Sequence, residues 1–271
     1  MSNRLADLTS ALRDLKLLAM ADCVSDVALK AARAQLSHEA FLYELVRLEQ
    51  EHRSQRRVER LRRESGLPRD KTFTTLQLAN FPAPVRHHVE RLRRGEFVTH
   101  AINVVAVGRP GVGKSHLLAS VGHALVAQGV SVLWSSTAHL MQRLLAAKRD
   151  LRLPQELARL DRFACLILDD IGYVQHDQDE MEVLFTLFAE RYERKSIMLS
   201  TNLVFSEWTR IFKNPMTTVA AIDRVVHHSV ILDLMGMASY RAKAATTAQQ
   251  LTTEVQPVTT AHAGAEEVPA A

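Results

Sequence analysis

The sequence is poor in cysteine, and its two thiols, Cys23 and Cys165, lie far apart in a chain of 271 residues. This usage excludes a disulfide framework and suits a reducing compartment. No apolar run approaches the ~18–20 residues that a membrane-spanning helix needs. The first residues mix Arg4 and Asp7 with leucines, which is not the pattern of a signal peptide. We therefore expect a soluble cytoplasmic protein with no membrane partner.

Net charge is also small, at +4, but it is unevenly distributed. Residues 53–94 contain twelve Arg or Lys and four Asp or Glu, a local charge of +8. Such asymmetry favours a polyanionic partner more than the total charge does. A solvated basic surface without a partner is the alternative that composition leaves open.

The first 66 residues are predicted to form a small all-helical N-terminal domain. Leucines recur at steps of three and four from Leu5 to Leu15, and a longer helical pattern follows Ser37, a candidate N-cap. Gly66 and the proline two residues later supply its stop signal. Residues 67–100 are predicted to be a connector with one short helix near 84–94.

From residue 101 the pattern changes to short apolar segments separated by helical ones. The predicted strands are 102–107, 131–135, 164–169, 196–200 and 229–233. Strands buried on both faces and alternating with helices predict an α/β core, residues 101–243, with a five-stranded parallel sheet covered on both faces. No C-terminal lid domain is expected, since about ten structured residues follow the last strand. Residues 244–271 lack aromatics and are predicted to be disordered.

Glycine is scarce, yet three of the ten glycines fall within one loop after the first predicted strand. The pattern G-x-x-x-x-G-K-[ST] is filled there by Gly108, Arg109, Pro110, Gly111, Val112, Gly113, Lys114 and Ser115, with His116 next in the chain. Such a loop wraps backbone N–H groups around phosphate oxygens at a helix N-terminus. Lys114 would neutralise the β- and γ-phosphates, and Ser115 would bind Mg²⁺. We predict that residues 108–116 bind ATP; an ordinary glycine-rich turn is the alternative.

Two acids and an amide end the next buried strands along the chain. Asp169 and Asp170 end the segment CLILDD, and Asn202 follows the segment SIMLST. Ligands of α/β proteins bind at this carboxyl edge of the sheet. We predict that Asp169 holds Mg²⁺, that Asp170 orients or deprotonates water, and that Asn202 contacts the γ-phosphate or that water. Solvated loop acids and a turn asparagine are the alternatives.

Arg224 lies far in sequence from the glycine-rich loop, just before the last predicted strand. An arginine brought to a neighbour's γ-phosphate can stabilise the charge of the transition state. A surface salt bridge with Asp223 is the alternative.

The order of these motifs resembles the IstB type of AAA+ ATPase, the ATP-binding helper of a class of bacterial insertion sequences, and more distantly DnaC helicase loaders. The resemblance covers roughly residues 5–243. It includes GRPGVGKSHL, LILDDIGY, DRVVHH and SYR, and above all RYERKSIMLSTNLVFSEWTRIF.

The resemblance implies that Lys114, Ser115 and Asp169 bind MgATP. It places Asp170 where many relatives carry glutamate, and it gives Asn202 a sensor role. It makes Arg224 a finger acting on the next subunit and puts Arg241 near a second ATP sensor. It further implies a homo-oligomer assembled with ATP on duplex DNA, which stimulates a transposase encoded alongside.

One predicted helix offers a surface for the DNA. Its four arginines at spacings i, i+3, i+4 and i+7 share a face: Arg53, Arg56, Arg57 and Arg60. Because this face holds no aromatic residue to stack on single-stranded bases, duplex backbone contact is favoured. A solvated face paired with Glu49 and Glu59 is the alternative.

Two other functions remain open at this point. A replicative helicase loader of the DnaC kind would use its N-terminal helices to bind a helicase. A small-molecule kinase would share the glycine-rich loop but would have no use for the basic helices or the Arg224 segment.

Overall fold

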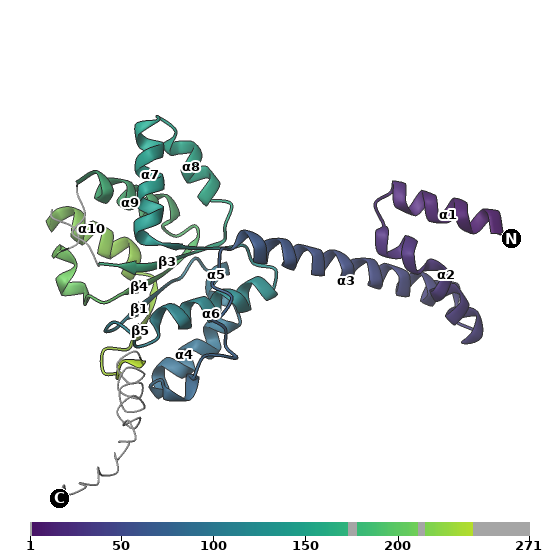
Figure 1. Ribbon diagram of the computed structural model, residues 1–271, viewed down its shortest axis with the longest axis horizontal. Coiled ribbons are helices and arrows are strands. Elements are labelled where there is room, and N and C mark those ends of the chain that lie inside the picture. The colour runs from purple at the N-terminus through teal and green to yellow at the C-terminus, as the bar shows by residue number, and fades with distance from the viewer. Residues whose placement is uncertain (1, 173–177, 211–214, 241–271) are drawn as a thin grey trace, which may run out of the picture.

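The computed structural model describes residues 2–172, 178–210 and 215–240 (Figure 1). The predicted tail, 244–271, and Arg241 lie outside these residues. None of the helices in the described part of the chain is long and apolar enough to cross a membrane.

Three helices form the N-terminal part: α1 (Ser2–Asp14), α2 (Leu18–Arg33) and α3 (His38–Glu64). The predicted N-cap is confirmed, since the Ser37 hydroxyl accepts the N–H of Ala40 at 3.2 Å. The stop is confirmed too, because α3 ends just before Gly66, which has a positive φ of 65°. Figure 1 shows α3 projecting from the rest of the molecule, with α1 and α2 packed at its far end.

These helices share a small apolar core of their own. It contains Leu12, Met20, Ala21, Val24, Val27 and Leu45. Of the predicted leucine stripe, Leu12 is buried, whereas Leu5 and Leu8 are exposed. The buried carboxylate of Glu49 joins α3 to α2, since it accepts the N–H groups of Ala19 at 2.9 Å and Met20 at 3.3 Å. Burial raises the pKa of Glu49, but these bonds and one from Arg53 outweigh it and keep the pKa below its ordinary value.

The connector contains a short 3₁₀ turn (Leu78–Asn80), α4 (Ala83–Arg93), as predicted, and α5 (Glu96–Thr99). Its apolar residues are buried in the core of the α/β part, where Phe81, Val85, Val89 and Phe97 join a cluster with Leu117. The connector is therefore a packed part of the fold.

The sheet consists of β1 (Asn103–Val107), β2 (Val132–Ser136), β3 (Cys165–Ile171), β4 (Ser196–Thr201) and β5 (Ser229–Asp233). All pairings are parallel and the order is β2-β3-β4-β1-β5. The five predicted strands are confirmed, with ends that differ by one or two residues. Strand β4 lies between β1 and β3. The carboxyl ends of these three parallel strands therefore lie side by side at one edge of the sheet.

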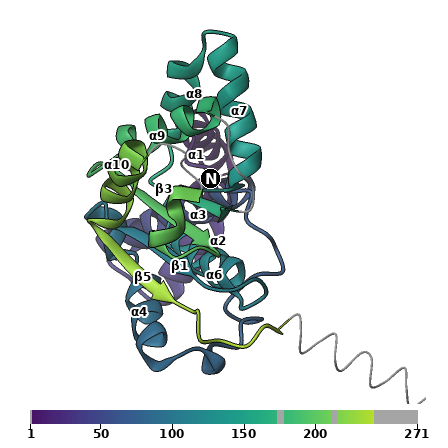
Figure 2. The same cartoon turned by 90° about the vertical axis from the view of Figure 1, so that its left-hand side faces the viewer.

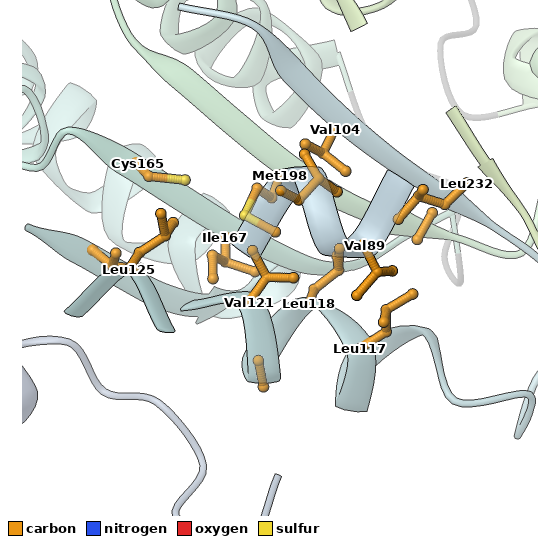
Figure 3. Packing of buried hydrophobic residues seen from close by; sticks show 14 of the residues in the cluster. Val89, Val104, Leu117, Leu118, Val121, Leu125, Cys165, Ile167, Met198 and Leu232 are labelled. Atoms are coloured by element: carbon orange, nitrogen blue, oxygen red, sulfur yellow. The ribbon is translucent and has the colours of Figure 1, made fainter. Parts of the chain in front are cut away.

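Helices cover both faces of the sheet, as predicted (Figures 1 and 2). They are α6 (Lys114–Ala127), α7 (Thr137–Arg149), α8 (Leu153–Leu160), α9 (Gln178–Arg191) and α10 (Pro215–Val226), with a 3₁₀ turn at Phe205–Arg210. On the α6 face, Leu118 and Val121 pack against Val104, Ile167 and Met198 (Figure 3). Alternate strand residues, such as Val105, face α7 and α9 instead.

A buried arginine fixes the turn between α8 and β3. The Arg191 side chain, with 2% of the residue exposed, donates to the carbonyl groups of Leu160, Phe163 and Ser196. Burial lowers the pKa of this guanidinium to about 10, yet it stays charged at neutral pH. The first residue of the RYER motif is therefore structural, because it satisfies carbonyls that the sheet does not pair.

Candidate nucleotide site

The glycine-rich loop joins β1 to α6 at the carboxyl edge of the sheet. Gly113 has a φ of 98° and precedes the first residue of α6, Lys114. The Lys114 side chain is buried, and its ammonium group donates to the carbonyls of Gly108 at 2.7 Å and Arg109 at 3.1 Å. The helix N-terminus and this ammonium group thus point at the same loop, which favours a bound anion.

Neighbouring segments lie so close to the loop that added side chains would press against them. A Cβ at Gly108 would lie 2.9 Å from Leu234 Cβ, and one at Gly113 would lie 3.2 Å from Phe81 Cζ. The segment after β5 lies beside the loop, since Tyr240 N–H donates to the carbonyl of Gly111 at 2.9 Å. The loop backbone is therefore held in one conformation, which suits the phosphate groups of a nucleoside triphosphate.

A serine and an aspartate meet beside this loop. Ser115 Oγ donates to Asp169 Oδ1 at 2.6 Å, across the space between α6 and β3. A hydroxyl and a carboxylate are oxygen ligands of the kind that Mg²⁺ prefers. No group of three or more His, Cys, Asp or Glu side chains that could hold a metal occurs in the described ranges. A metal here would therefore need the nucleotide to complete its shell.

Ser200 completes this arrangement, although no sequence motif predicted it. Its hydroxyl also donates to Asp169 Oδ1 at 2.6 Å, and it accepts the N–H of Asp170 at 2.7 Å. Ser200 reaches both acids because β4 is inserted between β1 and β3. Only the strand order shows this, and strand order is not readable from local pattern.

Asp170 has an unusual backbone conformation. Its φ is +65°, and the pairing of β3 with β4 shifts register between Leu168 and Ile171. A residue other than glycine rarely adopts a positive φ, and such strain concentrates at functional sites. The irregularity lies at the exposed Asp170, directly after the half-buried Asp169.

Asn202 directly follows β4, at the same edge. Its amide oxygen is buried and has no hydrogen-bond partner in the described part of the chain. Thr201, the residue before it, is paired with both Val107 of β1 and Ile171 of β3. The amide therefore lies between the two strands that carry the loop and the acids, and its unpaired oxygen is a group that a ligand or water would satisfy.

A cavity of about 350 Å³ extends from the loop toward the connector. Its lining comprises Lys71, Thr75, Leu76, Gln77, Gly111, Gly113, Lys114, Ser115, His116 and Tyr240. The connector residues and Tyr240 were not among the predicted site residues. The His116 ring lines the cavity and also holds the connector, with Nε2 at 3.0 Å from Thr75 Oγ1 and 3.2 Å from the Thr72 carbonyl.

Arg224 lies in the last turn of α10, at the opposite edge of the sheet. The carbonyl of the next residue, Val225, accepts from Asn103 Nδ2 at 3.1 Å, and Asn103 begins β1. The guanidinium carbon lies 4.6 Å from the centre of the Phe185 ring, and Nη1 donates to the Ala220 carbonyl at 3.2 Å. The aromatic ring and the helix carbonyl, not Asp223, are the contacts that hold this side chain.

The four arginines of α3 have different surroundings. Arg53 donates to Glu49 at 2.7 Å and to the Lys16 carbonyl at 3.1 Å, so it fastens α3 to the turn before α2. Arg57 donates to the Gly129 carbonyl at 3.0 Å. Arg56 and Arg60 are exposed and have no side-chain partner among the described residues. The predicted pairing with Glu49 is therefore observed for Arg53 alone.

Comparison with known proteins agrees with this geometry. A family model for the IstB-like ATP binding protein matches residues 10–248. An insertion sequence ATP-binding protein of Sinorhizobium fredii is 39% identical over 240 residues, which cover 88% of this chain and 80% of that protein. The ATP-binding protein of insertion sequence IS21 from Pseudomonas aeruginosa is 34% identical over 229 residues, with 84% and 86% covered.

Solved structures share the fold. DnaI matches with a TM-score of 0.52 and 18% identity, covering 62% of this chain and 95% of that chain. AMPPCP-bound DnaA from Aquifex aeolicus matches with a TM-score of 0.53 and 17% identity, covering 70% and 57%. The expected resemblance is confirmed. The chain belongs to the family of IstB-like ATP-binding proteins and is an AAA+ P-loop ATPase.

Proposed function

We propose that this ATPase is a transposition helper that assembles with ATP on duplex target DNA and stimulates a partner transposase, with hydrolysis as the disassembly switch. The observation that carries the ATP-driven part is the contact of Ser115 with Asp169 beside the buried Lys114. The insertion sequence relatives support the transposition part.

The site residues have distinct roles in this proposal. Mg²⁺, when bound with ATP, would neutralise phosphate charge, and Ser115 and Asp169 would hold it. Lys114 would exchange its carbonyl partners for the β- and γ-phosphates. Asp170 would accept the proton of the attacking water, and Asn202 would orient that water or the γ-phosphate. The base and ribose would lie in the cavity beside the connector, because the cavity continues from the loop in that direction.

Arg224 supports an oligomer. Strand β1 separates it from its own glycine-rich loop, and five residues span about 13 Å at ~3.3 Å per residue. Its guanidinium would therefore act on ATP bound to a neighbouring subunit, where a positive charge stabilises the transition state. Hydrolysis would then depend on assembly, as a switch requires.

The test combines assembly, DNA and turnover in one experiment. Sedimentation of the full chain with MgATP and a long duplex is expected to show an oligomer absent without nucleotide, and ATPase rate should rise with protein concentration. A transposase encoded next to this chain should bind that assembly. An ATPase rate per subunit that is independent of concentration, with no oligomer on DNA, would contradict the proposal.

A helicase loader is the second candidate, since DnaI shares the fold. Preference for single-stranded DNA and binding to a replicative helicase rather than to the transposase would favour it.

A further inference from the structure

A groove lined by arginines lies between helix α3 and the ATPase core. It has a volume of about 760 Å³. Its lining residues are Arg57, Arg60, Leu61, Glu64, Ser131, Leu133, Arg143, Arg159, Leu160, Arg162 and Phe163. Figure 1 shows α3 meeting the rest of the molecule beside α7 and α8, the elements that form the other wall.

Positive charge exceeds negative charge in this groove. Arg143 is paired with Glu156, and Arg159 lies 3.8 Å from the same carboxylate. Arg60 and Arg162, by contrast, are exposed and have no side-chain partner in the described part of the chain. Two guanidinium groups without a side-chain partner among the described residues therefore line the groove, one on α3 and one on the core.

The groove is separate from the nucleotide site. Ser131 directly precedes β2 and Phe163 lies just before β3, so the groove is at the amino ends of these strands. Ser115 and Asp169 lie at the carboxyl edge. The groove arginines therefore do not belong to the ATP site.

Hydrogen bonds fix the two walls relative to each other. The N–H of Trp134 in β2 donates to the Ser65 carbonyl at 2.7 Å, just after α3 ends. Arg57 adds its bond to the Gly129 carbonyl on the core. Because the two walls are already fixed, less conformational entropy is lost when a ligand binds in the groove.

We propose that this groove binds the sugar–phosphate backbone of duplex DNA, so that the DNA surface includes Arg159 and Arg162 of the ATPase core as well as α3. This inference rests on the proposed function and extends it. All five cations are arginines, whose planar forks match phosphate oxygens. The apolar residues between them, including Leu61 and Leu133, suit the sugar faces between phosphates.

Other ligands fit the groove less well. An acidic peptide that adds a strand to the sheet would need the edge of β2, but the Ser65 carbonyl already accepts the Trp134 N–H there. Single-stranded DNA would need exposed aromatic rings for its bases, whereas Phe163 packs against the core. Beyond the groove, the exposed Arg56 continues the line of cations along α3.

Salt-dependent binding of a mixed-sequence duplex to the full chain tests the groove. Arg159→Ala combined with Arg162→Ala is expected to weaken binding at low salt at least tenfold. It should reduce the slope of log K against log salt by about two, since each phosphate contact contributes about 0.9. Arg159→Lys with Arg162→Lys keeps the charge and should retain most of the slope. Unchanged ATP binding would show that the variants fold.

The matched control removes equal charge at the other end of the sheet. Arg91→Ala with Arg94→Ala removes two charges at the C-terminal end of α4, which packs beside β5, and should leave the slope nearly unchanged. If the groove variant behaves like this control while Arg56→Ala lowers the slope, the groove proposal is wrong but DNA binding through α3 stands. If the wild-type chain does not bind duplex, the proposed function itself fails. Polyglutamate serves as the probe for an acidic peptide. If the groove variant loses polyglutamate binding while its duplex slope is unchanged, the groove is an acidic-peptide site and the inference is overturned.

Discussion

Ser200 Oγ donates to the same oxygen of Asp169 that accepts from Ser115, and both distances are 2.6 Å. Ser200 thereby fixes the carboxylate that is proposed to hold Mg²⁺ and, through the N–H of Asp170, the acid proposed to activate water. It is a positioning residue, because it acts through these two side chains.

Ser200→Ala should therefore bind ATP nearly as well as the wild type but hydrolyse it about 10- to 150-fold more slowly, since a hydrogen bond to a charged group contributes about 1.5–3 kcal/mol. The Mg²⁺ concentration needed for half-maximal rate should rise. Ser200→Thr, which keeps the hydroxyl, should recover part of the rate. A rate loss without any change in Mg²⁺ dependence would show that Ser200 merely supports the sheet.

Asp170→Asn separates binding from hydrolysis. Asparagine tolerates a positive φ, so the backbone at this position should be preserved, whereas alanine would be strained there. Loss of a general base lowers a rate by about 10²–10⁴, and ATP affinity should stay within a few-fold of wild type. Calorimetric ATP titration and phosphate release measure the two quantities. Normal turnover in this variant would assign the water-activating role to another group.

Some of this site could be predicted from sequence and some could not. The glycine-rich loop and the five strands could be predicted from local pattern, because the loop motif and the hydrophobic periodicity are properties of short stretches of consecutive residues. Ser200 and the connector lining of the cavity depend on which strands become neighbours and on how residues 67–100 pack. Those choices are made by burial of apolar faces across the whole chain, and no short segment encodes them.

The N-terminal helices show the same division. Helix ends at Ser37 and Gly66 were predictable, since caps are local. The different environments of Arg53 and Arg56 were not, although both lie on the predicted face. The contact of Arg53 with the Lys16 carbonyl depends on how α1 and α2 fold back against α3.

The two thiols should differ sharply in reactivity. Cys165 is fully buried in the core, and burial raises its pKa to about 12, whereas Cys23 is partly exposed. A thiol reagent at pH 8 should therefore modify Cys23 in the native protein and Cys165 only after unfolding. Fast modification of both thiols in the folded chain would contradict this burial.

The same raised pKa predicts a pH effect on stability. Above about pH 8.5 the unfolded chain loses the Cys165 proton while the folded chain keeps it, so the stability that this thiol contributes falls as pH rises toward 12. Denaturant titrations between pH 8.5 and 10.5 should show a shallower decline for Cys165→Ala than for the wild type. Equal slopes for the two proteins would exclude the effect.

Arg224 carries the last prediction, on the coupling between subunits. Arg224→Ala should bind ATP almost normally, because its own loop is intact, but it should lose hydrolysis by about 10³–10⁵. It should also fail to build the oligomer on DNA. Lys114→Ala should lose ATP binding, since it removes the buried ammonium group from the loop. Each variant alone is expected to be inactive.

Mixing the two inactive proteins tests whether Arg224 acts on a neighbour. An Arg224→Ala subunit still offers a complete loop, and a Lys114→Ala subunit still offers the arginine on its Phe185 ring. Interfaces that combine the two should recover hydrolysis, and the recovered rate should pass through a maximum near equal amounts. An arginine that served its own subunit could give no such recovery. Mixtures that co-assemble on DNA but remain inactive would leave Arg224 as a residue that stabilises α10 against α9.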